Sequence, residues 1–273
     1  MSDRYAVIGN PIGHTKSPLI HRSFAKATGQ DIEYGAIEGS LDRFSDDVHA
    51  FRKAGGLGLN VTAPFKLQAL ALATERLERA ELAGATNALK FEGDRIIADN
   101  FDGVGLTRDI QSNLGFSLKG ARMLVLGSGG AVRGALLPFL AQQPVELVLA
   151  NRTLSKADDL AAQFAVHGPL RACAYADLAG ERFDIVINGT SASLKAELPP
   201  VPAEALQNAT LAYELAYGKG LTPFLRLAQN AGVPKLADGV GMLVEQAAEA
   251  FLWWRGVRPD TRAVIERMTI PLA

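Results

Sequence analysis

The sequence has very little cysteine and no clear excess of either charge. Cys173 is the only cysteine among 273 residues, so an internal disulfide is excluded and a reducing compartment suits the chain. Lys and Arg number 28 and Asp and Glu 29, for a formal net charge of −1. This balance gives no reason to expect a nucleic acid or an anionic membrane surface as partner.

Long apolar runs are also missing. No stretch reaches the roughly 18 apolar residues that a membrane-spanning helix needs. The opening MSDRYAVIGNPIGH lacks a basic patch followed by an apolar run, so we expect no signal peptide and a cytoplasmic protein. The four histidines are scattered, which predicts no metal site. The composition, 48% hydrophobic and 21% charged, is that of a soluble globular protein with one large domain or two ordinary ones.

Strand-like and helix-like segments alternate through most of the chain, which predicts an α/β fold with mostly parallel strands. YAVIGN reads as a strand, and SPLIHRSFAKATG as a helix with Ser17 as N-cap, Pro18 at its first position and Gly29 at its end. GLGLNVT is a second strand, after which PFKLQALALA begins a helix.

The alternation becomes tighter after Lys119. There ARMLVLG, VELVLAN and FDIVINGT read as strands with helices between them. The last 33 residues are helical and too apolar to remain in water, so we expect them to pack back onto the first domain or across the cleft. The predicted domains are therefore residues 1–101 together with 240–273, and residues 102–239.

The segment MLVLGSGGAVRGAL is the strongest local motif. A strand runs into Gly127, which permits a tight turn, and Gly129 or Gly130 would let a pyrophosphate approach the start of the next helix. Val132 stands where a dinucleotide fingerprint usually has its third glycine. Taken alone, the motif fits an ordinary strand-to-helix turn about as well.

The following strand ends in NRTLSK and favours a nucleotide site. An NAD site usually has a carboxylate there for the ribose, whereas an arginine can accommodate a 2′-phosphate. The sequence offers Arg152 and Lys156 as cations and Thr153 and Ser155 as hydroxyl donors. The alternative is that Thr153 or Ser155 caps a helix and Arg152 is only solvated. We predict NADP as the cofactor.

A lysine in the segment NVTAPFK is the second chemical feature. Lys66 falls in the first turn of a predicted helix, where a cation costs about 0.3–1 kcal/mol. Asp102 follows another strand and begins another helix, where it could be a plain cap. If the two meet at the strand ends, the helix favours a neutral amine and the carboxylate an ammonium. Such a lysine can exchange a proton with a carbonyl that is being reduced by hydride.

The segment NPIGHTKSP supplies a third feature. The hydroxyls of Thr15 and Ser17 lie at the mouth of the first helix, where a small anion such as a carboxylate would be well placed. The alternative is that Ser17 is only the N-cap of that helix.

These segments resemble those of the shikimate dehydrogenase family from Val7 to about Pro259. The resemblance rests on NPIGHTKSP, NVTAPFK, LAGATNAL, DNFDG, LGSGGA, NRT, NGTSA, YELAYGKGLTPFL and DGVGMLVEQAAEAF, in that order. It implies an α/β substrate domain and a Rossmann-like NADP-binding domain with a cleft between them. It also implies the reversible NADPH-dependent reduction of 3-dehydroshikimate to shikimate, a step toward the aromatic amino acids, by a monomer or homodimer.

The resemblance also implies roles for particular residues. Lys66 and Asp102 correspond to the catalytic pair, and Leu215 and Gly239 to residues beside the nicotinamide. The substrate-binding positions are Asn87, Thr62 and Gln246 for the ring hydroxyls and Thr15, Ser17 and Tyr217 for the carboxylate. The NADP positions are Gly127, Ser128, Gly129, Gly130, Ala131, Asn151, Arg152, Thr153 and Lys156.

Three positions depart from the family pattern. Thr15 replaces a serine, Phe101 replaces a threonine and adds a ring next to the site, and Lys156 replaces an arginine. These changes leave two alternatives open. One is a paralogue with altered substrate or cofactor use, which acts on quinate or a related cyclohexane carboxylate or uses NAD. The other is a dinucleotide-binding regulator without catalysis, against which the presence of Lys66 and Asp102 speaks.

Overall fold

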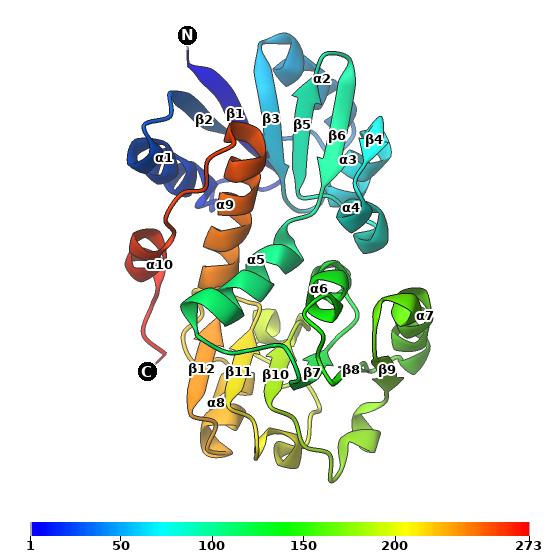
Figure 1. The fold of residues 1–273 in the computed structure, drawn as a ribbon. Helices are drawn as coiled ribbons and strands as arrows, with labels where there is room; N and C mark the ends of the chain where they lie inside the picture. The colour runs from blue at the N-terminus through cyan, green and yellow to red at the C-terminus, as the bar shows by residue number, and fades with distance from the viewer. Residues whose placement is uncertain (1, 273) are drawn as a thin grey trace. The chain divides into compact units, whose positions relative to one another are not determined.

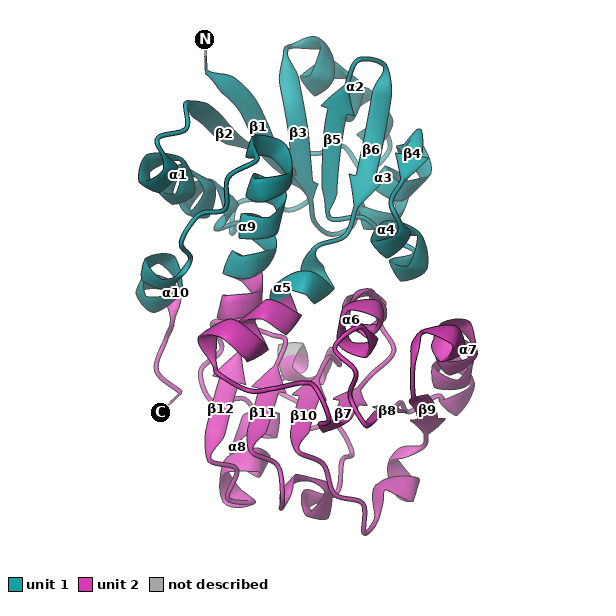
Figure 2. Cartoon of the chain, in the orientation of Figure 1, with its two compact units in different colours: residues 1–105, 244–267 teal, residues 106–243, 268–273 magenta. Residues whose placement is uncertain are grey.

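The computed structural model describes residues 2–272, apart from the side chain of Leu194, and forms two compact units. Unit 1 comprises residues 1–105 and 244–267, and unit 2 comprises residues 106–243 and 268–273 (Figure 2). The boundaries expected from the sequence, before 102 and 240, lie a few residues ahead of the observed ones. The expected division also placed residues 268–273 with the first domain. They group with unit 2 because Leu272 packs against the apolar core of that unit.

Unit 1 contains a six-stranded mixed sheet (Figure 1). Its strands, in spatial order, are β2 (Ile32–Glu38), β1 (Asp3–Gly9), β3 (Gly56–Val61), β5 (Ala88–Glu92), β6 (Arg95–Asp99) and β4 (Glu75–Arg76). β5 runs antiparallel to both β3 and β6, and the other pairs are parallel. The prediction of mostly parallel strands is confirmed, although nothing in the sequence identified the antiparallel strand.

Helices cover both faces of this sheet. They are α1 (Ser17–Thr28), α2 (Phe44–Lys53), α3 (Lys66–Leu72), α4 (Glu78–Ala83), the start of α5 (Asp102–Arg108), most of α9 (Val240–Arg255) and α10 (Arg262–Met268). Alternate residues of β1 point to opposite faces: Ile8 belongs to a core with Phe44 and Phe65, whereas Tyr5 belongs to a core with Trp254. The apolar C-terminal helix α9 thus packs on the sheet of unit 1.

The ends of α1 differ from the prediction at one position. Gly29 closes the helix in the left-handed conformation, with φ of 64°, as expected. The N-cap residue, however, is Lys16, and Ser17 is the first helical residue. The Ser17 backbone N–H is bonded to the Thr15 hydroxyl oxygen at 3.3 Å, so a side chain outside the helix takes the capping role.

Unit 2 contains a six-stranded sheet in which all neighbouring strands are parallel. Its spatial order is β9 (Leu170–Cys173), β8 (Glu146–Ala150), β7 (Arg122–Leu126), β10 (Ile185–Asn188), β11 (Leu211–Glu214) and β12 (Lys235–Asp238). From the centre of the sheet, β7, β8 and β9 follow one another toward one edge, and β10, β11 and β12 follow one another toward the other edge. This is the doubly wound order of the Rossmann fold, with its reversal between β7 and β10.

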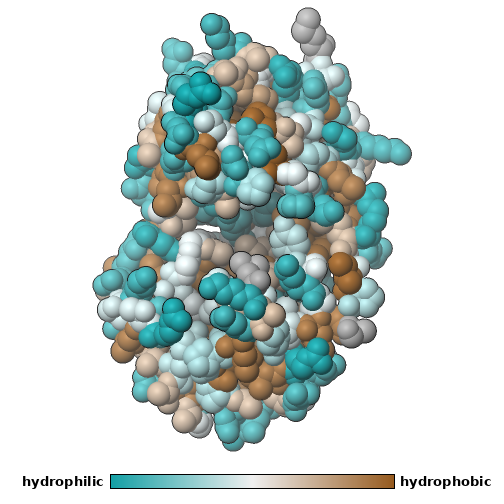
Figure 3. Space-filling view, turned by 180° about the vertical axis from the view of Figure 1, so that it is seen from behind, coloured by the Kyte–Doolittle hydropathy of each residue, from teal (hydrophilic) through white to brown (hydrophobic). Residues whose placement is uncertain are grey.

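The helices of unit 2 include the crossovers of this fold. They are α6 (Gly130–Leu140), α7 (Leu154–Phe164) and α8 (Pro223–Asn230), and α5 passes directly into a π-helix at Asp109–Asn113. Short 3₁₀ segments occupy Ala165–His167, Tyr175–Leu178, Ala192–Lys195 and Ala203–Leu206. Within residues 2–272, no helix combines the length and apolar character needed to span a membrane. The face in Figure 3 mixes hydrophilic and hydrophobic side chains.

Candidate active site and cofactor pocket

The polar residues of unit 1 follow the strands where the sheet order reverses. β2 lies on one side of β1 and β3 on the other, so the carboxyl ends of β1 and β3 form the switch point at which α/β sheets bind ligands. Thr15 and Ser17 follow β1, and Thr62 and Lys66 follow β3. Four of the predicted substrate-site residues therefore come from the two strands that flank this point.

The structure brings Lys66 and Asp102 together. Lys66 is the first residue of α3, Asp102 is the first residue of α5, and Lys66 Nζ lies 2.6 Å from Asp102 Oδ2. The lysine side chain is 33% exposed and the aspartate side chain 14%. The carboxylate compensates for the unfavourable position of a cation at a helix start. The amine also remains accessible, which a proton donor requires.

Asn87 and Gln246 complete a polar cluster with this pair. The buried Asn87 donates from Nδ2 to Asp102 Oδ1 at 2.8 Å and to Gln246 Oε1 at 3.2 Å. Its Oδ1 accepts the backbone N–H of Phe101 at 2.9 Å, which fixes the orientation of the amide. The positions 66, 87, 102 and 246 thus meet in one network, although they are far apart in the sequence.

Asp99 and Asn100, which precede Asp102, support its position and were not identified from the sequence. The Asp102 N–H donates to Asn100 Oδ1 at 3.1 Å, and the Asn100 N–H donates to Asp99 Oδ1 at 2.7 Å. Burial raises the pKa of Asp99, and the ion pair with Arg79 opposes this effect. The segment DNFDG could have indicated this role, because Asp and Asn side chains often accept hydrogen bonds from backbone N–H groups one or two residues further along the chain.

Phe101 does not add a ring to the polar cluster, contrary to the expectation from the sequence. It is 3% exposed and packs in the apolar core beside Trp253, with ring centroids 5.5 Å apart. The Arg79 guanidinium lies 5.3 Å from the centre of its ring. The backbone of Phe101 orients Asn87, while its side chain turns into the core because the residue is too apolar to remain beside the ion pair.

The hydroxyl groups near α1 lie close to a buried polar group that the sequence analysis missed. Thr15 Oγ1 and Ser17 Oγ are 3.3 Å apart, and Ser17 is 8% exposed. Close to Ser17, the buried Tyr34 donates its hydroxyl to Asn60 Oδ1 at 2.6 Å. The ring of His21 stacks on Tyr34 at 4.1 Å. Burial lowers the pKa of His21 to about 3, with Asn60 opposing, so this histidine is neutral.

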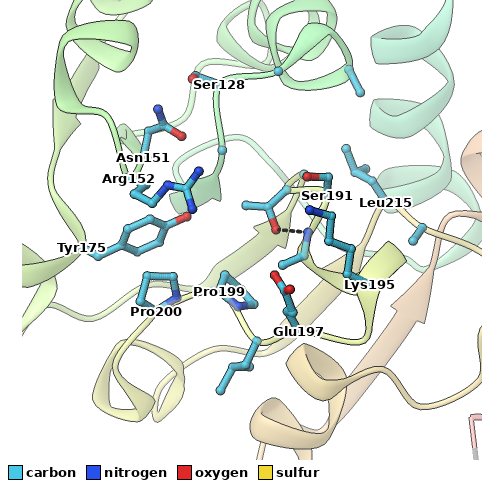
Figure 4. A pocket seen from close by; sticks show the side chains of 18 of the residues that line it. Ser128, Asn151, Arg152, Tyr175, Ser191, Lys195, Glu197, Pro199, Pro200 and Leu215 are labelled. Atoms are coloured by element: carbon cyan, nitrogen blue, oxygen red, sulfur yellow. Dashed lines mark hydrogen bonds between the residues drawn. The ribbon is translucent and has the colours of Figure 1, made fainter. Parts of the chain in front are cut away.

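Unit 2 contains a pocket of about 950 Å³ at the carboxyl ends of β7, β8 and β10 (Figure 4). Ten residues predicted to bind the cofactor line it: Gly127, Ser128, Gly129, Gly130, Ala131, Asn151, Arg152, Thr153, Lys156 and Leu215. Gly239 is not among the lining residues. A Cβ at Gly239 would lie 2.2 Å from Leu215 O, so this glycine permits the close approach of the chain behind Leu215. Tyr217, predicted to bind the substrate carboxylate, also lines this pocket.

Further residues from three segments, which follow β9, β10 and β11, line the pocket and were not identified from the sequence. They are Tyr175, Gly189, Thr190, Ser191, Ala192, Lys195, Glu197, Leu198, Pro199, Pro200, Ala216 and Lys219. Most follow β10, the second strand at the reversal of the sheet, and the motif NGTSA was the signal that could have identified them. In Figure 4, Arg152 and Tyr175 lie near each other, with Lys195 and Leu215 toward the other end.

The glycine loop leaves room for a ligand at the start of α6. Gly127 has φ of 101°, a conformation that favours glycine, and neither Gly129 nor Gly130 has an atom within 4 Å of a virtual Cβ. Gly189, the residue directly after β10, takes the place of the missing third glycine. A Cβ at Gly189 would lie 2.3 Å from Val132 Cγ2, so the close packing of helix and sheet depends on Gly189 instead.

The charge of the pocket favours a phosphorylated ligand. Its lining contains four basic residues, Arg152, Lys156, Lys195 and Lys219, and one carboxylate, Glu197. In the described part of the chain, neither Arg152 nor Lys156 has an ion-pair partner. Thr153 occupies the N-cap position of α7 but accepts no capping hydrogen bond, so its hydroxyl is available. Burial raises the pKa of Tyr175 to about 12, with Arg152 opposing, so the phenol stays neutral.

Across residues 2–272, no group of three or more His, Cys, Asp or Glu side chains is arranged to hold a metal ion. The remaining features are a Rossmann-like unit with a cationic pocket and a second α/β unit with a lysine–aspartate pair. Together they define the class: a two-domain, dinucleotide-dependent oxidoreductase.

Comparisons with known proteins agree with this class and narrow it to one family. Residues 7–89 match the model of the shikimate dehydrogenase substrate binding domain, residues 109–209 that of shikimate/quinate 5-dehydrogenase, and residues 239–269 that of the shikimate 5′-dehydrogenase C-terminal domain. The chain is 56% identical to the NADP⁺-dependent shikimate dehydrogenase of Nitrosospira multiformis over 97% of its own length and 96% of that protein.

Solved structures show the same similarity. The Ael1 enzyme of Pseudomonas putida is 66% identical, with a TM-score of 0.98 and full coverage of both chains. Shikimate 5-dehydrogenase of Thermus thermophilus, solved in complex with NADP(H) and shikimate, is 31% identical, with a TM-score of 0.86 and 97% coverage of each chain. The chain belongs to the shikimate dehydrogenase family, which confirms the resemblance seen in the sequence.

Proposed function

We propose that this protein catalyses the reversible NADPH-dependent reduction of 3-dehydroshikimate to shikimate. The observation that carries the proposal is the contact of 2.6 Å between Lys66 Nζ and Asp102 Oδ2, in a cluster with Asn87 and Gln246. The relative from Nitrosospira multiformis carries the name of this activity at 56% identity. The Thermus thermophilus structure contains shikimate and NADP(H) on the same fold.

The residues of the pocket in unit 2 fit NADP. The open space at Gly129 and Gly130 suits a pyrophosphate at the start of α6, where the helix dipole favours an anion. Arg152 and Lys156, which are without ion-pair partners among the described residues, suit the 2′-phosphate, with Thr153 as a hydroxyl donor. The end of β8 offers Asn151 where an NAD site would have a carboxylate. When bound, NADPH supplies the hydride.

In this proposal Lys66 transfers the proton. Its ammonium donates a proton to the carbonyl oxygen of the substrate during reduction, and its amine takes the proton back during oxidation. Asp102 holds the lysine in position and accepts its hydrogen bond, while Asn87 holds the other oxygen of Asp102. Thr62, Asn87 and Gln246 would bind ring hydroxyls.

Recognition of the substrate carboxylate would involve Thr15, Ser17 and Tyr217. The paired hydroxyls of Thr15 and Ser17 could each donate to a carboxylate oxygen. Tyr217 is 44% exposed, so its hydroxyl is accessible to a ligand. Leu215 and Gly239 would border the nicotinamide.

We also infer a cytoplasmic monomer or homodimer whose ligands are small molecules. A single buried cysteine needs no oxidising compartment. The near-equal numbers of basic and acidic residues supply no field for nucleic acid or anionic lipid.

One assay tests this function. Purified protein is incubated with shikimate or quinate, each with NADP⁺ or NAD⁺, and the reduced cofactor is followed by absorbance. We expect the highest kcat/KM with shikimate and NADP⁺. A higher kcat/KM with quinate and NAD⁺ would replace the proposal by the paralogue. Tight NADPH binding without turnover of any substrate would replace it by the regulator.

A further inference from the structure

Glu214 is a completely buried carboxyl group that none of the proposed steps uses. It is the last residue of β11, the strand that leads into the pocket residues Leu215, Ala216 and Tyr217. Its exposure is 0%, and burial raises the pKa of its carboxyl group. An acidic side chain in such a place is retained only if its hydrogen bonds compensate for desolvation.

Four donors satisfy this carboxyl group. Oε2 accepts from Asn188 Nδ2 at 2.9 Å, from Thr222 Oγ1 at 3.2 Å and from the hydroxyl of Ser193. Oε1 accepts the backbone N–H of Ala216 at 3.3 Å. No cation takes part in these contacts, so the role of Glu214 is to gather neutral donors.

The donors come from the two loops that line the pocket. Ser193 belongs to the loop after β10, and Ala216 and Thr222 bound the loop between β11 and α8. The network reaches further through Asn188, whose Oδ1 accepts from both the N–H and the hydroxyl of Thr190. The first loop contributes Thr190 and Lys195 to the pocket, and the second contributes Tyr217 and Lys219. One carboxyl group thus joins both walls.

We propose that Glu214 is a positioning residue for NADP binding, which fixes the loop after β10 and the loop after β11 in the arrangement that receives the cofactor. The inference rests on the proposed function, because it takes the pocket to be the NADP site. Glu214 acts through the loops and does not itself line the pocket in the described residues.

The substitution Glu214→Gln tests the network with little change in shape. An amide has one oxygen and one NH₂ group, whereas Glu214 accepts hydrogen bonds at both oxygens. Turned one way, the amide sets its NH₂ group against the Ala216 N–H; turned the other way, it sets that group against Asn188 Nδ2 and the hydroxyls of Ser193 and Thr222. The hydroxyls can rotate and accept, but Asn188 Nδ2 and the Ala216 N–H can only donate, so at least one hydrogen bond of the network is lost in either orientation.

A carboxylate at the opposite end of the same sheet provides the matched control. Glu146 begins β8 and accepts from Arg122 at 2.7 Å and from Arg171 at 2.6 Å. Like Glu214 it belongs to unit 2, but it lies at the amino end of the strands, away from the pocket residues. Glu146→Gln therefore weakens unit 2 without touching either loop.

The experiment measures NADPH binding by fluorescence titration and the KM values for NADP⁺ and shikimate. For Glu214→Gln we expect the Kd of NADPH and the KM of NADP⁺ to rise about tenfold, with the KM of shikimate nearly unchanged. Ser193→Ala, which removes one attachment only, should raise the Kd about threefold. Glu146→Gln should leave all three constants near those of the wild type.

The outcomes separate this inference from the proposed function. If the wild type binds NADPH but does not oxidise shikimate, the Kd values still decide the role of Glu214. The inference is overturned if the wild type does not bind NADPH. It is also overturned if folded Glu214→Gln and Ser193→Ala bind NADPH as the wild type does, or if Glu146→Gln weakens binding equally. Should Glu214→Gln fail to fold, the Kd of Ser193→Ala decides alone.

Discussion

The two units build their ligand sites in different ways. In unit 2, the pocket contains several runs of residues that are consecutive in the chain, such as Gly127 to Ala131 and Asn151 to Thr153. In unit 1, the cluster consists of the side chains of Lys66, Asn87, Asp102 and Gln246, each from a different segment. A site built from such short runs can in large part be recognised from local sequence, whereas a site made from distant side chains depends on the fold.

The two sites also differ in how their charged side chains are paired. The cation Lys66 is paired with a carboxylate inside the protein, whereas Arg152 and Lys156 have no ion-pair partner within residues 2–272. A pair of opposite charges suits a group that exchanges a proton with an uncharged carbonyl or hydroxyl group of the substrate. Unpaired cations suit a ligand that brings its own negative charge. This contrast predicts that substitutions in unit 1 affect turnover and substitutions in unit 2 affect cofactor affinity.

The largest effect should come from Lys66→Ala. Loss of the proton donor should reduce kcat by about 10²–10⁴-fold, while the Kd of NADPH remains near that of the wild type. Lys90→Ala is a close control, because Lys90 also pairs with a carboxylate at 2.6 Å and its side chain is 27% exposed. Comparable kcat values for the two variants would remove Lys66 from the mechanism.

Phe101→Thr tests whether the ring serves the core or the site. Phe101 is 3% exposed and packs in the apolar core with Trp254, so the change should lower the free energy of unfolding by about 3 kcal/mol. Chemical denaturation measures this loss, and shikimate kinetics should show little change in KM. The opposite pattern, with unchanged stability and an altered preference between shikimate and quinate, would contradict the core position.

Arg152→Ala should affect the cofactor alone. Removing a cation that binds the 2′-phosphate should raise the KM of NADP⁺ about tenfold and leave the KM of NAD⁺ unaffected, since NAD⁺ lacks that phosphate. Arg182→Ala, a change at an exposed arginine of the same unit that contacts Asn208, is the control. A rise in both KM values, or in neither, means that Arg152 does not distinguish the two cofactors.

Counted per pH unit, the smallest effect concerns the stability of unit 1. The pKa of His21 is about 3 in the folded protein and about 6.5 when unfolded. Below pH 6.5 the unfolded chain binds a proton that the folded chain does not, so stability is lost as the pH falls from 6.5 toward 3. The slope attributable to His21 should approach about 1.4 kcal/mol per pH unit. His21→Phe should remove this slope in denaturation experiments, whereas His49→Gln should keep it.

Local patterns in the sequence were sufficient for much of unit 2. The apolar strands, the glycine loop after β7 and the residues after β8 predicted a nucleotide pocket and supplied nine of its lining residues, and the family resemblance added Leu215. The loop after β10 was missed as a pocket wall because its position depends on Glu214, which is the last residue of a different strand. The sequence also did not show that Gly189 takes the role of the third glycine, because Val132 and Gly189 are 57 residues apart and come into contact only in the folded protein.

In unit 1 the sequence indicated the important residues but not their surroundings. Lys66 was conspicuous because a cation is unfavourable at a helix start, and Asp102 because it follows a strand. The antiparallel strand β5, the stacked pair of His21 and Tyr34 and the buried ring of Phe101 were not foreseen. The direction of β5 depends on how the strands pair, and the two side-chain features depend on which face of the sheet a residue occupies; both are decided by tertiary packing.

The sequence by itself determined the α/β alternation, the position of the glycine loop and the family, because these depend on residue types at short or fixed spacing. Only the tertiary structure decided the partners of Lys66, the placement of Phe101 in the core and the joining of two loops by Glu214. The physical reason is that hydrogen bonds and packing act over a few ångströms in space, whatever the separation along the chain.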